Sequence, residues 1–199
     1  MILKLYSNNT SQRDIDRICD ILKGGGVMIY PTDSLYAFGC AIDSPKAVER
    51  VKQLTGKDTS DMSLMFNDIS SMAEYCRIDN ATFKLLKRNL PGAITFILRA
   101  SSRIPDKVIA KRKTIGARIA DNAIARAIVE SLGAPIFTTS LKSVDEVEYI
   151  VDPELIHEQW GRQVDIVIDG GIGLTTPTTI VDISDGDVEV VREGEAELK

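Results

Sequence analysis

The sequence is short of several residue types on which common functional sites depend. Aromatic residues make up only 6% of the chain, so a surface built from stacked aromatic rings is not expected. The single histidine, His157, excludes most metal sites and histidine relays and is expected on a helix surface. Cys19, Cys40 and Cys76 are far apart and contain no C-x-x-C pair. They are predicted to be reduced thiols in a cytoplasmic protein.

Long apolar runs and nucleotide-binding glycine loops are also absent. No run approaches the roughly 18 apolar residues that a membrane span needs, so no membrane partner is expected. The N-terminal residues lack the features of a secretory signal. There is neither a Walker loop nor a G-x-G-x-x-G fingerprint. A net charge of −5 disfavours binding of nucleic acid over the whole surface, although it leaves room for local basic patches.

Helix and strand patterns alternate along a chain with 44% hydrophobic and 27% charged residues, as in an ordinary globular domain. Strands are expected at 2–6, 27–30, 63–66, 94–98, 113–119, 134–139, 164–168, 178–183 and 188–191. Helices are expected at 11–22, 45–54, 70–75, 79–89, 122–132 and 153–160, and an exposed acidic loop at 144–148. This order predicts an α/β fold of the α+β type, in which one twisted mixed β-sheet is flanked by helices in a single domain over residues 1–199.

Polar side chains cluster where several of the predicted strands end. Pro31-Thr32-Asp33-Ser34 follows a buried strand, and Thr114-Ile115-Gly116-Ala117-Arg118 carries an arginine within another. Hydroxyl groups gather at Phe137-Thr138-Thr139-Ser140 and again at 175–179. Ligands of open α/β sheets bind beyond strand ends, and the planar fork of arginine suits a carboxylate or a phosphate. Each run alone could be a turn or an ordinary strand, but together they predict a shared anion pocket.

Six segments, in this order, resemble the YrdC/YciO family, which includes the threonylcarbamoyl-AMP synthases of tRNA modification. They are GGGVMIYPTDSLYAFGCAI (24–42), LPGAITFIL (90–98), KTIGARIADNAIARAIVESLGAPIFTTS (113–140), DIVIDGG (165–171), PTTIVDI (177–183) and VVREG (190–194). They cover most of the chain in one register. The resemblance implies a YrdC-like fold.

The resemblance also implies an enzyme, a nucleotidyltransferase that makes a mixed anhydride from threonine, bicarbonate and ATP and releases pyrophosphate. ATP with Mg²⁺ is then a substrate, and neither a tightly bound cofactor nor a metal site of the protein is implied. The residues implied at the threonine are Thr32, Arg118, Thr138 and Thr178, with Arg118 pairing with the carboxylate. Those implied at ATP are Thr55, Lys57, Thr114, Ser140, Lys142 and Arg192, and Lys57 and Arg118 are the implied catalytic residues.

Two motifs depart from the pattern of the synthases. Their Lys-x-Arg pair reads Thr55-Gly56-Lys57 here, and Met62 replaces a proline further along the loop. Their Ser-x-Asn reads Ser140-Leu141-Lys142, and we hypothesise that Lys142 restores the cation lost at Thr55. The loss of a preorganised cation facing a phosphoryl group costs on the order of 10² to 10³ in rate. With these substitutions the two motifs resemble those of the YciO branch more than those of the synthases. They predict weakened or altered catalysis.

Two other functions remain open beside the enzyme. The resemblance also implies binding of transfer RNA or double-stranded RNA, for which phosphate contacts are expected from Lys84, Lys87, Arg88, Lys111, Arg112 and Lys113. Such charges also occur on ordinary solvated faces, and the net charge is negative. The third possibility is a structural or partner protein that keeps an unused cleft. It would gain no stability from a nucleotide, whereas a true ligand stabilises the fold by mass action.

Overall fold

The computed structural model describes residues 1–6, 10–58, 61–105, 113–141 and 147–199. The strands are β1 (Ile2–Lys4), β2 (Val27–Tyr30), β3 (Ala37–Ala41), β4 (Ser63–Met65), β5 (Ile94–Arg99), β6 (Thr114–Arg118), β7 (Ile136–Ser140), β8 (Ile166–Asp169), β9 (Thr179–Asp182) and β10 (Glu189–Arg192). The helices are α1 (Gln12–Lys23), α2 (Pro45–Thr55), α3 (Ile69–Tyr75), α4 (Asn80–Asn89), α5 (Ala123–Leu132), α6 (Glu148–Val151) and α7 (Pro153–Trp160).

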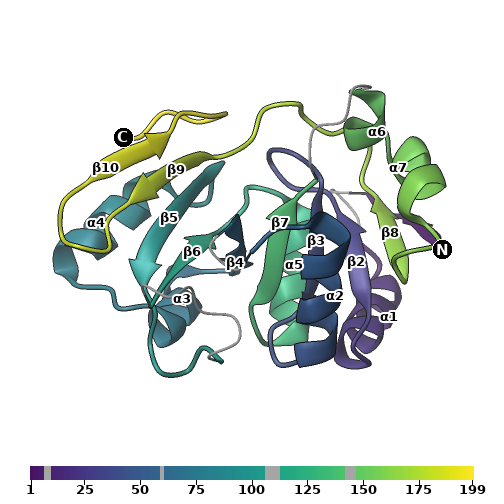
Figure 1. Cartoon of the computed structure of the whole chain (residues 1–199), viewed down its shortest axis with the longest axis horizontal. Coiled ribbons are helices and arrows are strands. Elements are labelled where there is room, and N and C mark those ends of the chain that lie inside the picture. Colours follow the sequence, from purple (N-terminus) through teal and green to yellow (C-terminus); the bar gives the residue numbers. More distant parts are fainter. Residues whose placement is uncertain (7–9, 59–60, 106–112, 142–146) are drawn as a thin grey trace.

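All ten strands belong to one sheet, in the order β1-β8-β2-β3-β7-β4-β6-β5-β9-β10 (Figure 1). Pairing is parallel for β1 with β8, β8 with β2, β4 with β6 and β5 with β9. The remaining neighbours pair in the antiparallel sense. The predicted twisted mixed sheet flanked by helices is therefore confirmed. Within the described residues, none of the helices has both the length and the apolar character needed to cross a membrane.

Several helices begin where the sequence provides a side chain that can cap them. Ser44 accepts a hydrogen bond from the backbone N–H of Ala47 at the start of α2, and Asn122 accepts one from Ala125 at the start of α5. Ser11 precedes α1 in an extended conformation, but its side chain makes no capping hydrogen bond. These caps satisfy backbone donors that have no partner inside the helix, which fixes where α2 and α5 begin.

Two elements differ from the sequence-based expectation. Strand β3 was not predicted, because its sequence AFGCA is made mostly of small residues with weak strand preference. A Cβ atom on Gly39 in β3 would lie only 2.9 Å from side-chain atoms of Met28, Tyr30 and Ile136, so tertiary packing requires glycine there. The acidic loop expected up to residue 148 gives way to helix α6 from Glu148, and residues 144–146 lie outside the described residues.

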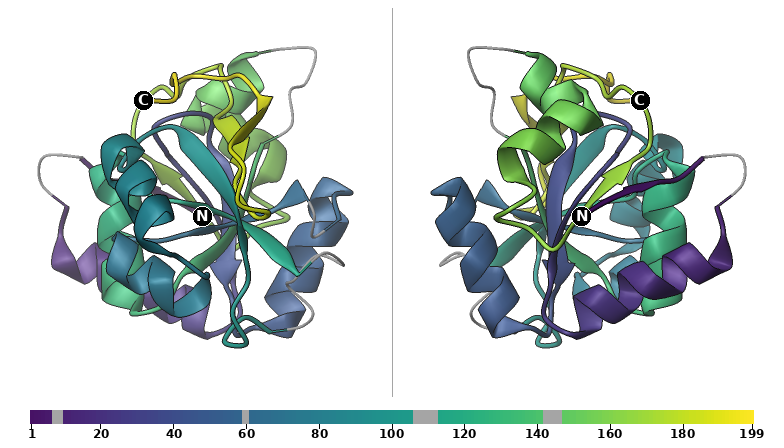
Figure 2. Two further views of the ribbon diagram at one scale, coloured as in Figure 1. Left: turned by 90° about the vertical axis from the view of Figure 1, so that its left-hand side faces the viewer. Right: turned by 90° about the vertical axis from the view of Figure 1, so that its right-hand side faces the viewer.

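Apolar layers cover both faces of the sheet around β8, β2, β3 and β7. Helices α1 and α5 pack against one face, where Ile18 and Ile128 meet Met28 and Ile166. Helices α2 and α7 pack against the other, and the two side views show α2 opposite α1 and α5 (Figure 2). Further along the sheet, Phe96 shares its core with Met72 of α3 and Leu86 of α4. The opposite face of that part of the sheet forms a cleft.

The buried cysteines give the fold a testable dependence on pH. Burial raises the pKa of the Cys40 and Cys76 thiols from 9.0 to about 12. Because the folded protein holds these protons more tightly than the unfolded chain, their stabilising contribution is complete below about pH 9 and is lost as the pH rises towards 12. We expect the free energy of unfolding to fall with pH between 9 and 11 by about 1 kcal/mol per pH unit for each thiol.

Denaturant unfolding at several pH values checks this dependence. The variants Cys40→Ala and Cys76→Ala, singly and together, provide the comparison. Each removes one thiol, so each should make the decline with pH shallower by the same amount. Equal slopes for the wild type and the double variant would contradict the expected burial effect.

Candidate functional site

A cleft of about 830 Å³ lies over β4, β5, β6, β7, β9 and β10. Its floor follows from the alternation of side chains along these strands. In β5, Thr95 and Ile97 line the cleft, whereas Ile94, Phe96 and Leu98 are buried in the core on the other face. Seven of the predicted site residues also line it: Lys57, Thr114, Arg118, Thr138, Ser140, Thr178 and Arg192. The structure therefore brings most of the predicted anion pocket together.

Gly116 keeps the middle of this floor open. It lies beside Ser63 of the neighbouring strand β4. A Cβ atom on Gly116 would be 2.9 Å from Ser63 Cβ and 3.1 Å from Thr95 Cγ2, which is closer than real Cβ atoms tolerate. Backbone therefore forms the floor at this point, so the long side chain of Arg118 stands beside an unobstructed space.

Arg118 is almost completely buried, with 4% of its surface exposed, and its charge is neutralised by Asp33. The guanidinium donates to the Asp33 carboxylate and to Ser34 Oγ, the latter over 3.3 Å. Asp33 also accepts a hydrogen bond of 2.7 Å from the backbone N–H of Asp121, just before α5. The Nε of Arg118 is the only buried side-chain nitrogen or oxygen in the described part of the chain that lacks a hydrogen-bond partner.

Thr32 lies in the turn that carries Asp33, and it is not among the residues that line the cleft. Its hydroxyl donates to the carbonyl of Leu35 over 2.7 Å and accepts from the backbone N–H of Ser34 over 3.0 Å. Ser34 Oγ lies 3.1 Å from the same oxygen. In this structure the Thr32 hydroxyl is used to fold the turn that brings Asp33 to Arg118.

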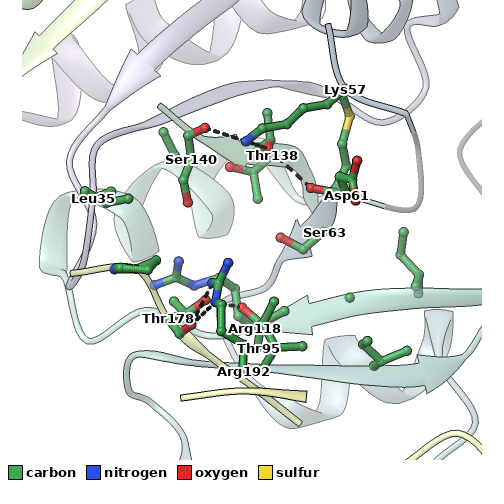
Figure 3. Close-up of a pocket in the computed structure, with 18 of the residues that line it drawn as sticks. Leu35, Lys57, Asp61, Ser63, Thr95, Arg118, Thr138, Ser140, Thr178 and Arg192 are labelled. Atoms are coloured by element: carbon green, nitrogen blue, oxygen red, sulfur yellow. Dashed lines mark hydrogen bonds between the residues drawn. The ribbon is translucent and has the colours of Figure 1, made fainter. Parts of the chain in front are cut away.

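Lys57 reaches the cleft from the loop that follows α2. Gly56 ends the helix with a positive φ of 60°, a conformation that suits glycine. The Lys57 ammonium donates to Thr139 Oγ1 over 2.8 Å and to the carbonyl of Ser140 over 2.9 Å. Figure 3 shows Lys57 and Ser140 on one side of the cleft and Arg118, Arg192 and Thr178 on the other.

Thr55, the other predicted contact from this loop, points elsewhere. Its hydroxyl donates to the Val51 carbonyl over 2.8 Å within α2, and the residue is 7% exposed. It is not among the cleft residues. Lys142, proposed to replace its missing charge, lies outside the described residues.

The hydroxyl groups on the Arg118 side form a compact set. Thr178 Oγ1 lies 3.0 Å from Thr95 Oγ1, and both residues are buried. The Thr178 carbonyl accepts two hydrogen bonds from Arg192, of 2.7 and 3.3 Å. Arg192, predicted at the nucleotide, thus lies beside Thr178 (Figure 3). Partial burial lowers the pKa of its guanidinium, although an arginine stays protonated.

Charged side chains of both signs line the cleft. Among the described residues, Lys57, Arg118 and Arg192 contribute three cations, and Asp58, Asp61 and Asp182 contribute three carboxylates. No group of three or more histidine, cysteine, aspartate or glutamate side chains in the described residues could hold a metal ion.

Comparison with known proteins assigns the chain to a family. Residues 20–194 match the Sua5/YciO/YrdC family model, whose description reads "Telomere recombination". The chain is 40% identical over 197 residues to the protein named uncharacterized protein YciO of Escherichia coli K12, covering 98% of this chain and 96% of that protein. The chain belongs to the Sua5/YciO/YrdC family. The resemblance found in the sequence is thereby confirmed.

More distant members of the family are named for an activity. A Methanocaldococcus jannaschii protein, named putative threonylcarbamoyl-AMP synthase, is 30% identical over 199 residues, covering 97% of this chain and 92% of that protein. Among solved structures, that of E. coli YciO has a TM-score of 0.94 at 39% identity and covers 100% of this chain and 98% of that one. The crystal structure of P. abyssi Sua5 complexed with L-threonine has a TM-score of 0.88 at 19% identity. It covers 98% of this chain and 57% of that one, and at this identity it shows a shared fold.

Some cleft residues of this family member were not singled out from the sequence. These residues are Thr95 and Ser63. Thr95 has a recognisable signal, because it is a polar residue between the buried Ile94 and Phe96 in an apolar strand. Ser63 has no comparable signal, since a serine at the start of a strand is common.

The described residues among those predicted to bind RNA do not line the cleft. Lys84, Lys87 and Arg88 are exposed on α4, whose buried side joins the core, and none of them lines the cleft. Lys113 is exposed immediately before β6. Lys111 and Arg112 lie outside the described residues. The described part of the predicted basic set is thus divided between α4 and the start of β6.

The ion pair of Arg118 with Asp33 predicts a large effect on stability. Asp33→Asn leaves a buried guanidinium without its counter-charge, which should lower the free energy of unfolding by about 3 kcal/mol in denaturant titrations. Adding Arg118→Met to the Asp33→Asn variant should then lower the free energy of unfolding much less than Arg118→Met does in the wild-type protein. Asp185→Asn is the control, because it removes an exposed pair with Arg99, with side chains 85% and 57% exposed, and should cost under about 0.5 kcal/mol. Additive effects of the two changes at Asp33 and Arg118 would contradict this account.

Proposed function

We propose that the cleft binds ATP with Mg²⁺ together with a small amino acid such as threonine, and that the chain acts as an L-threonylcarbamoyladenylate synthase with an altered phosphate-binding loop. In this reaction the amine of threonine forms a C–N bond to the carbon of bicarbonate, and water is lost to give a carbamate. A carbamate oxygen then attacks the α-phosphorus of ATP, the bond from that phosphorus to the bridging oxygen breaks, and pyrophosphate leaves. The product is the adenylate used in threonylcarbamoyladenosine modification of tRNA.

The unpartnered Nε of Arg118 carries the proposal. A buried N–H without an acceptor is costly, and native proteins rarely contain one. Because Arg118 lines the cleft, a bound carboxylate would supply the missing acceptor once a shift of the side chain exposes Nε to the cleft. Asp33 would hold the guanidinium in place for that contact rather than compete with it, since an arginine has five N–H donors.

The hydroxyl groups beside Arg118 support an amino acid as the ligand. In the pair formed by Thr95 and Thr178, one hydroxyl donates to the other, so one hydrogen of the pair remains available to a ligand. Leu35 and Ala37 provide an apolar wall in the same cleft. The crystal structure of P. abyssi Sua5, a protein of the same fold, contains L-threonine, a ligand of the same class.

The opposite side of the cleft supports the nucleotide. Lys57 is held at the end of β7 beside Ser140, where an ammonium and a hydroxyl can meet phosphate oxygens. Mg²⁺ bound to the phosphates of ATP would offset part of the charge of the nucleotide. Thr55 provides no cation there, so we expect a slower reaction than in a synthase with the full Lys-x-Arg pair.

Thermal unfolding with added ligands tests the binding step. Mg²⁺ and ATP at about 100 times the dissociation constant should stabilise the fold by about 2.7 kcal/mol, with a further shift when threonine and bicarbonate are added. Lys57→Met removes a charged hydrogen-bond donor and should weaken ATP binding about tenfold or more. Lys46→Met is the matched control, because Lys46 is exposed at the start of α2, the helix that leads to Lys57, and does not line the cleft. No shift with millimolar ATP would overturn the proposal.

Binding of RNA is the second candidate, favoured by the three exposed cations Lys84, Lys87 and Arg88 on one helix. Phosphate contacts make such binding depend strongly on salt. Double-stranded RNA should bind more weakly at 200 mM than at 50 mM salt in a fluorescence anisotropy titration. Replacing the three residues with alanine should weaken binding and make the salt dependence shallower. Unchanged binding by this variant would show that these residues of α4 do not contact RNA.

A further inference from the structure

The hydroxyl of Thr138 is constrained on two sides by the protein itself. It donates to the carbonyl of Phe38 over 2.8 Å, and a carbonyl oxygen can only accept. It also lies 2.9 Å from the hydroxyl of Tyr30. Since the single hydrogen of Thr138 is used on Phe38, Tyr30 must be the donor in this second contact. One lone pair of Thr138 is left, and it can only accept.

Tyr30 reaches Thr138 across an intervening strand. Tyr30 ends β2 and Thr138 lies in β7, with β3 between them. Gly39 of β3 pairs with Thr138, and a Cβ atom on Gly39 would lie 2.9 Å from Tyr30 Cε1. The absence of a side chain at Gly39 thus makes room for the tyrosine ring. The unexpected glycine-containing strand and the contact with Thr138 are parts of one arrangement.

The Tyr30 hydroxyl remains a donor at physiological pH. Burial raises its pKa to about 12, an effect that the hydrogen bond to Thr138 and the charge of Arg118 only partly offset. Arg118 and Thr138 reach the cleft from β6 and β7, the two strands that flank β4. The cleft therefore contains both a donor, Arg118, and an acceptor, Thr138.

We propose that Tyr30 is a positioning residue that sets ligand selectivity. Its hydrogen bond fixes Thr138 as a single acceptor for an N–H group of the ligand. That N–H group lies next to the ligand carboxylate that Arg118 holds. The inference rests on the proposed function and adds the residue that discriminates among small acids. With Phe38 and Tyr30 occupying two directions around the Thr138 oxygen, the third direction is determined. A ligand without a donor at that place leaves the acceptor unpaired, and sites built for a hydrogen bond reject such analogues strongly.

The test compares L-threonine with 3-hydroxybutyrate, which lacks only the amino group. Dissociation constants are measured by calorimetry in the presence of ATP and Mg²⁺. Wild-type protein should bind threonine at least about tenfold more tightly than 3-hydroxybutyrate. Tyr30→Phe should reduce this ratio severalfold by weakening threonine binding, and the affinity for ATP alone should stay unchanged.

Tyr36→Phe is the matched control, because it too removes a tyrosine hydroxyl. The Tyr36 hydroxyl makes two hydrogen bonds. Those bonds go to the backbone of Gly170 and Gly171, over 3.1 and 2.7 Å, and not to a hydroxyl of the cleft. The control variant should lose stability and keep the ratio. Thr138→Ser should keep the ratio of the two dissociation constants, and Thr138→Val should lose it. These two variants test the acceptor at Thr138 even if Tyr30→Phe does not fold.

The outcomes separate the two proposals. A folded Tyr30→Phe protein with the wild-type ratio would overturn the role of Tyr30 and leave the proposed function intact. Loss of the ratio with serine at Thr138 would overturn the role too, because serine retains the acceptor. Wild-type protein that binds neither acid would overturn both proposals.

Discussion

The burial of a guanidinium at the end of strand β6 determines how the cleft is built. Arg118 is 4% exposed, so its charge requires a partner inside the protein, and Asp33 is that partner. To reach it, the chain makes a turn after β2 that is held by the Thr32 hydroxyl, and the backbone before α5 supplies another donor to Asp33. A loop, a strand and a helix start are thereby fixed relative to one another around a single charge.

That arrangement divides the cleft into two chemically different sides. The Arg118 side is buried and rich in hydroxyl groups, whose hydrogen bonds connect β2, β3 and β7 and join β5 to the residue before β9. The Lys57 side depends on one lysine held by the end of β7. The departures from the synthase motif at Thr55, Met62 and Lys142 all concern residues other than those of the Arg118 side. Under the proposed function, this division would let the small-ligand side stay unchanged while the contacts to phosphate differ.

The sequence predicted the alternation of elements and many of the residues that line the cleft, because both depend on local pattern. Asn122 and Ser44 cap the helices that they were expected to begin, and Arg118, Thr138 and Thr178 meet in one cleft. The hydrogen-bond partner of each hydroxyl group was not predictable from the sequence. Thr32 and Thr55 donate to carbonyls of Leu35 and Val51, so their hydrogens are already used by local backbone. The partnership of Asp33 with Arg118 joins residues 85 positions apart, which no local pattern specifies.

Release of pyrophosphate from ATP is the most direct test of the central claim that this cleft activates an amino acid. Purified protein is incubated with Mg²⁺, ATP and bicarbonate, with and without L-threonine, and pyrophosphate is measured over time. The account predicts release that depends on both threonine and bicarbonate, at a rate below that of a synthase with the complete Lys-x-Arg pair. Release that is independent of threonine, or no release while both ligands are bound, would contradict it.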